Sequence, residues 1–220
     1  MSRSDPAPGL FVTGTDTGVG KSVAAAWLAA RLAACYWKPV QSGLEEESDS
    51  QCVARLAGLE AAAVLPETYR LHMPLSPHES ARRDGVEIQL SAFVLPDGQG
   101  RPVVVEGAGG VLVPLNGREK MIDLMVQLAL PVVVVARTTL GTINHTLLTL
   151  EALRRRELEV AGVILCGVPN GVNREAIVGF GGVTLLAEIP WLDPVNRESL
   201  AAVAPADPTL WDAFRRRFDE

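Results

Sequence analysis

The chain has 220 residues, 48% of them hydrophobic and 21% charged, with a formal net charge of −6. This size and composition suit one α/β domain with a packed core and exclude a globally disordered chain. No basic stripe alternates with aromatic residues, which argues against nucleic acid as a partner. No apolar stretch reaches the length of about 18 residues that a membrane span needs without meeting a charge or a helix breaker.

Two features indicate a cytoplasmic protein. Residues 1–8 carry Asp5 and two prolines and lack the apolar centre of a signal peptide, so they predict a flexible tail ahead of a domain spanning residues 9–220. The three cysteines, Cys35, Cys52 and Cys166, are far apart and form no CxxC pair. That spacing is typical of free thiols in a reducing compartment.

In the first half of the chain, residues 9–13 form an apolar run that predicts a strand, and a glycine-rich turn follows it. Residues 21–34 are rich in alanine and leucine and predict a helix. Residues 36–40 predict an extended segment and residues 50–57 a short helix. Residues 66–77 contain several prolines and predict a loop.

In the second half, valine-rich runs predict buried strands at residues 102–106, 131–136, 160–165 and 184–189. Helices are expected at residues 121–128, 142–156 and 209–218. Strands alternate with helices, and several strands are apolar throughout. We therefore predict a single-domain, three-layer α/β fold with a mainly parallel central sheet and helices on both faces.

A phosphate loop is predicted between the first strand and the first helix. Residues 14–22 read Gly-Thr-Asp-Thr-Gly-Val-Gly-Lys-Ser. Small residues let backbone N–H groups converge on phosphate oxygens, and the helix N-terminus adds partial positive charge. Lys21 can reach the β- and γ-phosphates, and the Ser22 hydroxyl can ligate Mg²⁺. Five residues separate Gly14 from Gly20, where the usual pattern has four.

Three further residues are candidates for the same site. Glu106 ends a predicted buried strand, where ligands collect in open α/β sheets, and a carboxylate there suits Mg²⁺. Asp49 in an acidic segment is a weaker candidate, with a solvated turn as the alternative. Lys38 follows the extended segment and can present an ammonium to anions, with a surface lysine as the alternative.

Six short stretches resemble the dethiobiotin synthetase family, and they occur in the order in which the family has them. They comprise residues 11–22, 38–43, 76–78, 105–110, 140–149 and 188–192. Together they span the chain from about residue 10 to residue 194. Each match is modest alone, but six in order are highly specific, and they also imply a P-loop NTPase-like fold.

The resemblance implies an ATP- and Mg²⁺-dependent cyclo-ligase of biotin synthesis that acts on 7,8-diaminononanoate (diaminopelargonate). CO₂ adds to one amine to give a carbamate, whose oxygen attacks the γ-phosphate of ATP. The other amine then closes the ureido ring and expels phosphate. Such phosphoryl transfer to a weak oxygen nucleophile depends on positioning and charge neutralisation.

The resemblance also implies roles for individual residues. Lys21 and Lys38 would be catalytic, and Ser22, Asp49 and Glu106 would surround Mg²⁺. The expected nucleotide-binding residues are Thr17, Gly18, Val19, Gly20, Lys21, Ser22, Val23, Asp49, Glu106, Gly107, Ala108, Gly109, Pro190, Trp191 and Leu192. The expected substrate-binding residues are Thr15, Asp16, Lys38, Ser42, Gly141, Thr142, Ile143 and Asn144. In the family, the segment matching the last four serves the partner subunit's substrate, which implies a homodimer.

The sequence departs from the family pattern in three places. The first helix and second strand are shorter, and so is the segment before Pro102. At the position of an adenine-reading asparagine, after the strand at residues 160–165, stands Cys166. The third departure puts the choice of nucleotide base in question.

Three other kinds of protein share a phosphate loop of this type. An amide-forming ligase such as a cobyrinate diamide synthase carries a glutaminase domain, for which this chain has no length left. A regulatory ATPase of the partitioning or septum-site type has an extra lysine early in its phosphate loop, where this chain has Thr15 and Asp16. A non-catalytic nucleotide-binding module is disfavoured because Lys38, Ser42 and Glu106 accompany the loop.

Overall fold

The computed structural model describes residues 9–218, so the predicted tail at residues 1–8 lies outside it. A seven-stranded sheet forms the middle of the molecule, and all its strands are parallel. In spatial order the strands are β4 (Val64–Leu65), β2 (Cys35–Trp37), β6 (Val103–Gly110), β1 (Gly9–Gly14), β7 (Val132–Arg137), β8 (Val160–Cys166) and β9 (Leu185–Ile189). The predicted parallel sheet is confirmed.

Side chains of successive strand residues enter two separate cores, one on each face of the sheet. Leu10 and Val12 belong to one core, and Phe11 between them belongs to the other. The alternation follows from the period of two in a β-strand. Because both faces are covered, the strands carry apolar residues at most positions, which is why valine runs mark them in the sequence.

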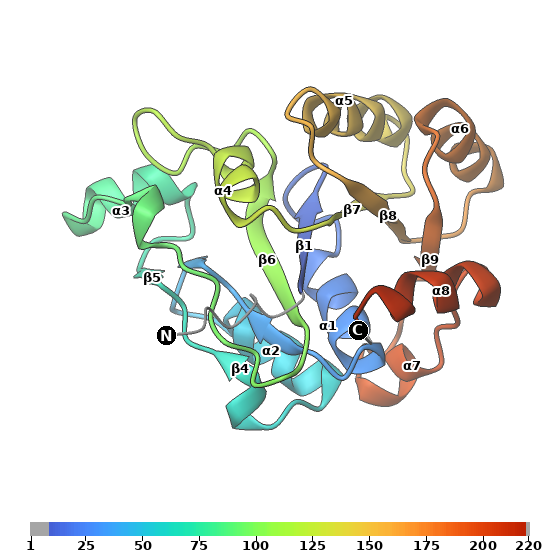
Figure 1. Ribbon diagram of the computed structural model, residues 1–220, viewed down its shortest axis with the longest axis horizontal. Coiled ribbons are helices and arrows are strands. Elements are labelled where there is room, and N and C mark those ends of the chain that lie inside the picture. Colours follow the sequence, from blue (N-terminus) through green and yellow to red (C-terminus); the bar gives the residue numbers. More distant parts are fainter. Residues whose placement is uncertain (1–8, 219–220) are drawn as a thin grey trace, which may run out of the picture.

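Helices cover both faces (Figure 1). The first core is closed by α1 (Lys21–Arg31), α2 (Asp49–Ala57), α7 (Arg197–Ala201) and α8 (Pro208–Arg215). The second is closed by α3 (Pro77–Asp84), α4 (Met121–Leu128), α5 (Thr142–Arg154) and α6 (Gly171–Gly181). Three-residue 3-10 turns are η1 (Ala61–Ala63), η2 (Leu90–Ala92) and η3 (Arg216–Phe218). The three-layer prediction is confirmed.

The C-terminal helix α8 packs against the first helix through aromatic rings. The ring centroids of Trp27 in α1 and Trp211 in α8 are 4.8 Å apart in an edge-on arrangement. Trp27 also donates its indole N–H to the carbonyl oxygen of Val203, at 3.0 Å. These contacts attach the end of the described chain to the helix that carries the phosphate loop.

Strand β1 lies at the point where the chain changes direction across the sheet. After β1 the chain builds β2 and later β6 on one side, and then β7, β8 and β9 on the other. In open α/β sheets the crevice at the carboxyl ends of the strands beside such a switch point is the usual ligand site. The glycine-rich loop leaves β1 there.

Several predicted boundaries were wrong. The extended segment at residues 36–40 is two strands, β2 and β3 (Val40–Ser42), and β3 pairs with β5 (Tyr69–Leu71) in a small second sheet. Pro39, which lacks a backbone N–H, separates them. The predicted loop at residues 66–77 therefore contains a strand, and α3 begins at its end. The first helix ends at Arg31, because Ala33 adopts a left-handed conformation (φ 50°) before β2.

The strand predicted to end at Glu106 continues through the following glycines to Gly110 as β6. Gly14 of β1 still pairs with Gly110. A Cβ atom on Gly107 would lie 2.8 Å from the ring of Phe11, so glycine is needed for this close approach. Helices α6 and α7 had no counterpart in the sequence prediction. Within residues 9–218, no helix combines the length and apolar character required to cross a bilayer.

Candidate active site

The phosphate loop wraps the start of α1 at the end of β1. Gly20 has φ 93°, a conformation that favours glycine, and it immediately precedes Lys21 and Ser22 in the first turn of α1. The ammonium of Lys21 curls back over the loop and donates to the carbonyl oxygen of Asp16, at 3.0 Å. Residues of the loop and of the first turn of α1, Lys21 among them, line one cavity, as an anion site requires.

Lys38 is buried and fully paired. Its side chain is 3% exposed, and its Nζ lies 2.7 Å from Asp49 Oδ2 and 3.1 Å from Glu106 Oε1. It also donates to the carbonyl oxygen of Gly107, at 3.2 Å. An ammonium has three protons, and three acceptors surround this one. Burial alone would lower the pKa of Lys38, but the two carboxylates outweigh it and raise the pKa.

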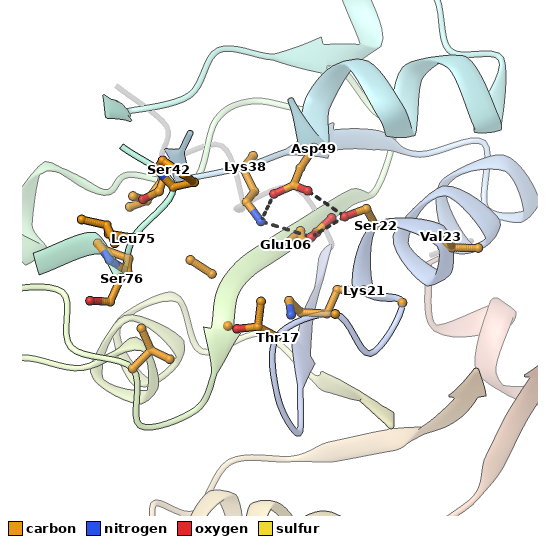
Figure 2. A pocket seen from close by; sticks show the side chains of 18 residues that line it. Thr17, Lys21, Ser22, Val23, Lys38, Ser42, Asp49, Leu75, Ser76 and Glu106 are labelled. Atoms are coloured by element: carbon orange, nitrogen blue, oxygen red, sulfur yellow. Dashed lines mark hydrogen bonds and ion pairs between the residues drawn. The ribbon is translucent and has the colours of Figure 1, made fainter. Parts of the chain in front are cut away.

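The hydroxyl of Ser22 lies between the same two carboxylates. Its Oγ is 2.9 Å from Asp49 Oδ1 and 3.0 Å from Glu106 Oε1 (Figure 2). A hydroxyl carries one proton and can donate to only one of them at a time. Three oxygen atoms therefore lie close together with too few protons to pair them all, an arrangement that a cation would relieve.

Glu106 is 1% exposed, and each of its oxygens has donors. Oε1 faces Ser22 and Lys38, and Oε2 accepts from the hydroxyl of Tyr36, at 2.9 Å. Burial, followed by the nearby Glu106 charge, raises the pKa of Tyr36 well above its usual value, so its hydroxyl stays protonated and donates.

Helix α2 fixes Asp49. Ser48 caps the helix by accepting from the backbone N–H of Gln51, and the Gln51 side chain accepts from the Ser48 N–H in return. Asp49 is the first residue of the helix, and its own N–H donates to the side chain of Gln41, at 3.1 Å. Burial alone would raise the pKa of Asp49, but Lys38, the Ser22 hydroxyl and Lys21 together outweigh it and lower the pKa.

These side chains line a cavity of about 750 Å³ at the carboxyl ends of β1, β2 and β6. In Figure 2, Lys38, Asp49, Glu106 and Ser22 form its linked centre, while Ser42, Leu75 and Ser76 lie across from them. The Ser42 hydroxyl is buried and has no hydrogen-bond partner within the described part of the chain. A second cavity of about 520 Å³ adjoins the first, since Thr17 and Val113 line both.

Comparison with known proteins identifies the family. A family model described as an AAA domain matches residues 8–199. The ATP-dependent dethiobiotin synthetase of Paramagnetospirillum magneticum is 54% identical over 197 residues, which cover 90% of this chain and 95% of that protein. The enzyme of the same name from Bradyrhizobium diazoefficiens is 50% identical over 193 residues, covering 88% of this chain and 92% of the relative.

The chain belongs to the family of ATP-dependent dethiobiotin synthetases. The resemblance found in its motifs is thereby confirmed.

Solved structures with the same fold include distant ATPases. The septum site-determining protein MinD from Pyrococcus horikoshii, complexed with Mg-ADP, superposes with a TM-score of 0.57 at 15% identity, covering 97% of this chain and 95% of that one. A ParA family ATPase from Chlorobium tepidum gives 0.55 at 12% identity, with coverages of 97% and 98%. Identities this low carry no functional argument. The superpositions nevertheless confirm the predicted P-loop NTPase-like fold of this dethiobiotin synthetase family member.

The structure brings together most of the residues that the family resemblance pointed to. Those lining the first cavity are Thr17, Gly18, Gly20, Lys21, Ser22, Val23, Lys38, Ser42, Asp49, Glu106, Ala108 and Gly109. Thr15 and Asp16 line the second cavity. Gly107 lies beside the first cavity and accepts from Lys38. Val19 is 2% exposed and belongs to the core, so only its backbone could meet a ligand.

Two predicted segments lie apart from both cavities. Residues 141–144 form the start of α5, and residues 190–192 follow β9, with Trp191 82% exposed. Cys166 is the last residue of β8 rather than a residue beyond it. Its sulfur lies 3.9 Å from the carbonyl oxygen of Gly20, and burial raises the pKa of its thiol to about 12.

Sequence reasoning missed Tyr36 and Gln41, which hold Glu106 and Asp49 in place. One pattern could have pointed to Tyr36. Residues two apart on a strand share a face, so Tyr36 lies on the same side as Lys38. The contact of Gln41 with Asp49 joins segments separated by a loop, and no local sequence pattern predicts it.

Proposed function

We propose that this site catalyses the ATP-dependent closure of the ureido ring of dethiobiotin from 7,8-diaminononanoate and CO₂. One amine adds to CO₂ and loses a proton to give a carbamate. A carbamate oxygen attacks the γ-phosphorus, releases ADP and forms a carbamic-phosphoric anhydride. The second amine attacks the carbamate carbon, loses a proton and expels phosphate, so one oxygen of CO₂ leaves in the phosphate.

The observation that carries this proposal is the convergence of two ammonium groups and two carboxylates on one cavity in a member of this family. Lys21 begins α1 and Lys38 follows β2, and both line the cavity with Asp49 and Glu106. The charges of the two positive and two negative side chains cancel. The site therefore presents little net electrostatic field to an incoming polyanion. Positioning and local charge compensation are what phosphoryl transfer needs.

The nucleotide phosphates belong at the loop. Backbone N–H groups of residues 17–23 would surround them, and Lys21 would move from the Asp16 carbonyl to a phosphate oxygen. The backbone N–H donors are fixed by the fold of the loop, so they have little to reorganise in the transition state. Residues 107–109 form the facing wall, and residues 190–192 are proposed to flank the base.

The donor set at Ser22, Asp49 and Glu106 fits Mg²⁺. All three present oxygen atoms. One oxygen of each carboxylate lies within 3.0 Å of the Ser22 hydroxyl oxygen. Among residues 9–218 no group of three or more His, Cys, Asp and Glu side chains is arranged to hold a metal. That suits Mg²⁺, which usually takes one or two carboxylates and completes its shell with water and phosphate oxygens. When bound, it would offset charge on the β- and γ-phosphates.

The diamine substrate is proposed to extend from Lys38 toward the second cavity. Lys38 would stabilise the carbamate and the charge that develops during transfer. The unpartnered hydroxyl of Ser42 faces the same space and can bind a polar group beside the amines. Thr15 and Asp16 line the adjoining cavity, where the aliphatic chain would run.

We propose that the enzyme is a homodimer in which residues 141–144 bind the carboxylate of the partner's substrate. This helix start has no side-chain cap, and the first N–H groups of a helix lack intrahelical partners. The exposed apolar residues around it support an interface: Leu140 is 96% exposed, Leu148 55% and Leu112 58%. We place the enzyme in the cytoplasm because its three cysteines are free.

An isotope experiment tests the proposed reaction. The protein is incubated with diaminopelargonate, ATP, Mg²⁺ and ¹⁸O-labelled bicarbonate, and the products are weighed by mass spectrometry. We expect dethiobiotin together with phosphate carrying one ¹⁸O atom, in an amount that depends on the diamine. ATP hydrolysis without dethiobiotin, or phosphate without label, would refute the carbamate route and favour a regulatory ATPase.

A further inference from the structure

We propose that Tyr36 is a positioning residue that orients Glu106 for the divalent cation. The inference rests on the proposed function, because it concerns the metal site at Ser22, Asp49 and Glu106. Tyr36 lines neither cavity and is 0% exposed, so it meets neither nucleotide nor substrate directly. It acts through its hydroxyl, whose hydrogen-bond partner within residues 9–218 is Glu106 Oε2, at 2.9 Å.

Because of this contact, the two carboxylate oxygens of Glu106 have different hydrogen-bond partners. Oε2 accepts from the hydroxyl of Tyr36, a residue that lines neither cavity, while Oε1 faces Ser22 and Lys38. A carboxylate with one oxygen held in this way cannot rotate freely, and it offers a single oxygen to the cavity. Carboxylate ligands of metals are commonly fixed by such a donor, and loss of the donor weakens metal binding.

The position of Tyr36 is rigid because of the sheet. Strand β2 lies between β4 and β6, and Tyr36 pairs with Val104. Two residues further along each strand come Lys38 and Glu106, on the same face as Tyr36 and Val104. The register of two buried parallel strands therefore sets the Tyr36–Glu106 contact, and no mobile loop takes part in it.

The chain supplies a matched control. It has two tyrosines, Tyr36 and Tyr69. The Tyr69 hydroxyl also makes one hydrogen bond, accepting from the backbone N–H of Gln89 at 3.1 Å, and its ring packs against Phe93. Tyr36→Phe and Tyr69→Phe thus each remove one bonded hydroxyl and keep the ring, but only the first touches Glu106.

The test measures how much Mg²⁺ strengthens binding of a non-hydrolysable ATP analogue, as the ratio of Kd in EDTA to Kd in Mg²⁺. We expect Tyr36→Phe to reduce this ratio by about tenfold to a hundredfold, the range for loss of such a donor, with the Kd in EDTA unchanged within about twofold. Tyr69→Phe should leave the ratio unchanged. In the activity assay, Tyr36→Phe should need more Mg²⁺ for half-maximal rate, with kcat at saturating Mg²⁺ largely retained.

Glu106→Gln separates the two proposals. If it reduces the ratio and Tyr36→Phe does not, the metal site stands and the role of Tyr36 is overturned. If Glu106→Gln leaves the ratio unchanged, or the wild type gains nothing from Mg²⁺, the metal site itself fails and Tyr36 with it.

A measurement on the wild type covers the case in which Tyr36→Phe does not fold. With tyrosine labelled by ¹³C at the hydroxyl-bearing ring carbon, the two tyrosines give two signals, and Tyr69→Phe assigns them. Adding Mg²⁺ with the analogue should shift the Tyr36 signal well beyond the shift caused by the analogue in EDTA. Equal shifts in the two conditions would overturn the inference.

Discussion

The ammonium of Lys38 lies 2.7 Å from Asp49 and 3.1 Å from Glu106, so one buried cation serves both carboxylates of the site. The sequence left open whether Lys38 is a surface lysine or an anion-binding residue. The structure instead buries Lys38 and gives each of its protons an acceptor. Replacement of Lys38 should therefore affect both folding stability and catalysis.

We expect Lys38→Ala to lower kcat/KM by about a hundredfold or more, the usual effect of removing one preorganised charge from a reaction centre. It should also lower the free energy of unfolding by on the order of 1–3 kcal/mol, less than for a fully enclosed pair because cavity water can reach Asp49. Urea unfolding and steady-state kinetics measure the two effects. Only three lysines occur in the chain, and Lys120→Ala, outside both cavities, is the control.

A double variant distinguishes the two effects of Lys38. Adding Asp49→Asn to Lys38→Ala removes an unpaired carboxylate and should restore part of the stability. Activity should stay low, because the ammonium is still missing. Near-wild-type turnover in either variant would remove Lys38 from the mechanism.

Nucleotide binding should weaken at alkaline pH because of Lys21. Burial, and then the neighbouring Lys38, lower the pKa of Lys21 below its usual 10.5. Phosphate binds the protonated ammonium and raises its pKa, so affinity is full below the pKa of the free enzyme. Above that pKa, affinity falls by up to about tenfold per pH unit. Kd for ATP in EDTA, measured from pH 7 up to the usual lysine pKa of 10.5, should rise toward the alkaline end.

Lys21→Met is the control for the pH profile. The variant keeps a long side chain but has no titrating group, so its weaker binding should vary less with pH than that of the wild type. Parallel profiles for the two proteins would assign the decline to another group.

The sequence predicted the sheet well because each strand is buried on both faces. Val132–Arg137 has four successive valines, a pattern that water-exposed strands lack. It failed for the segment after Lys38, because Pro39 divides one apparent strand into two that join different sheets. It also missed α6, whose three glycines and exposed Phe180 give no clear helical stripe.

The candidate site could be predicted where one short segment supplies its geometry. The loop from Gly14 to Ser22 is continuous in sequence, so the spacing of its residues alone predicts a phosphate-binding loop. The contact of Tyr36 with Glu106 spans 70 positions and depends on strand register. Register between parallel strands is set by the whole sheet, so this partner emerged only with the structure.

The proposed dimer interface can be tested at α5. Leu148 is 55% exposed beside the second cavity, and a charge there should oppose burial against a second copy. We expect Leu148→Glu to shift the protein from dimer to monomer in light scattering and to raise KM for the diamine. Leu210→Glu is the control, because Leu210 is similarly exposed at 47% but lies on α8. A wild-type monomer with full activity would contradict the interface.

The choice of nucleotide base should be loose. An asparagine amide, expected from the family at the position of Cys166, can both accept from the adenine amine and donate to a ring nitrogen. A thiol accepts and donates only weakly. The thiol of Cys166 already contacts the carbonyl oxygen of Gly20 in the loop. It is neutral because burial raises its pKa to about 12. Sites that hydrogen-bond a polar group discriminate far better than sites that merely fit it.

With base readout weakened, the phosphate loop should dominate affinity, and the loop ignores the base. We therefore expect kcat/KM for ATP to exceed that for GTP or CTP by about tenfold or less, equivalent to about 1.4 kcal/mol. Side-by-side kinetics with the three nucleotides measure this ratio. The competing explanation is that backbone groups of residues 167–170 or 190–192 read adenine without the amide. A preference for ATP above about a hundredfold, or about 2.7 kcal/mol, would establish backbone readout and rule out weak selectivity.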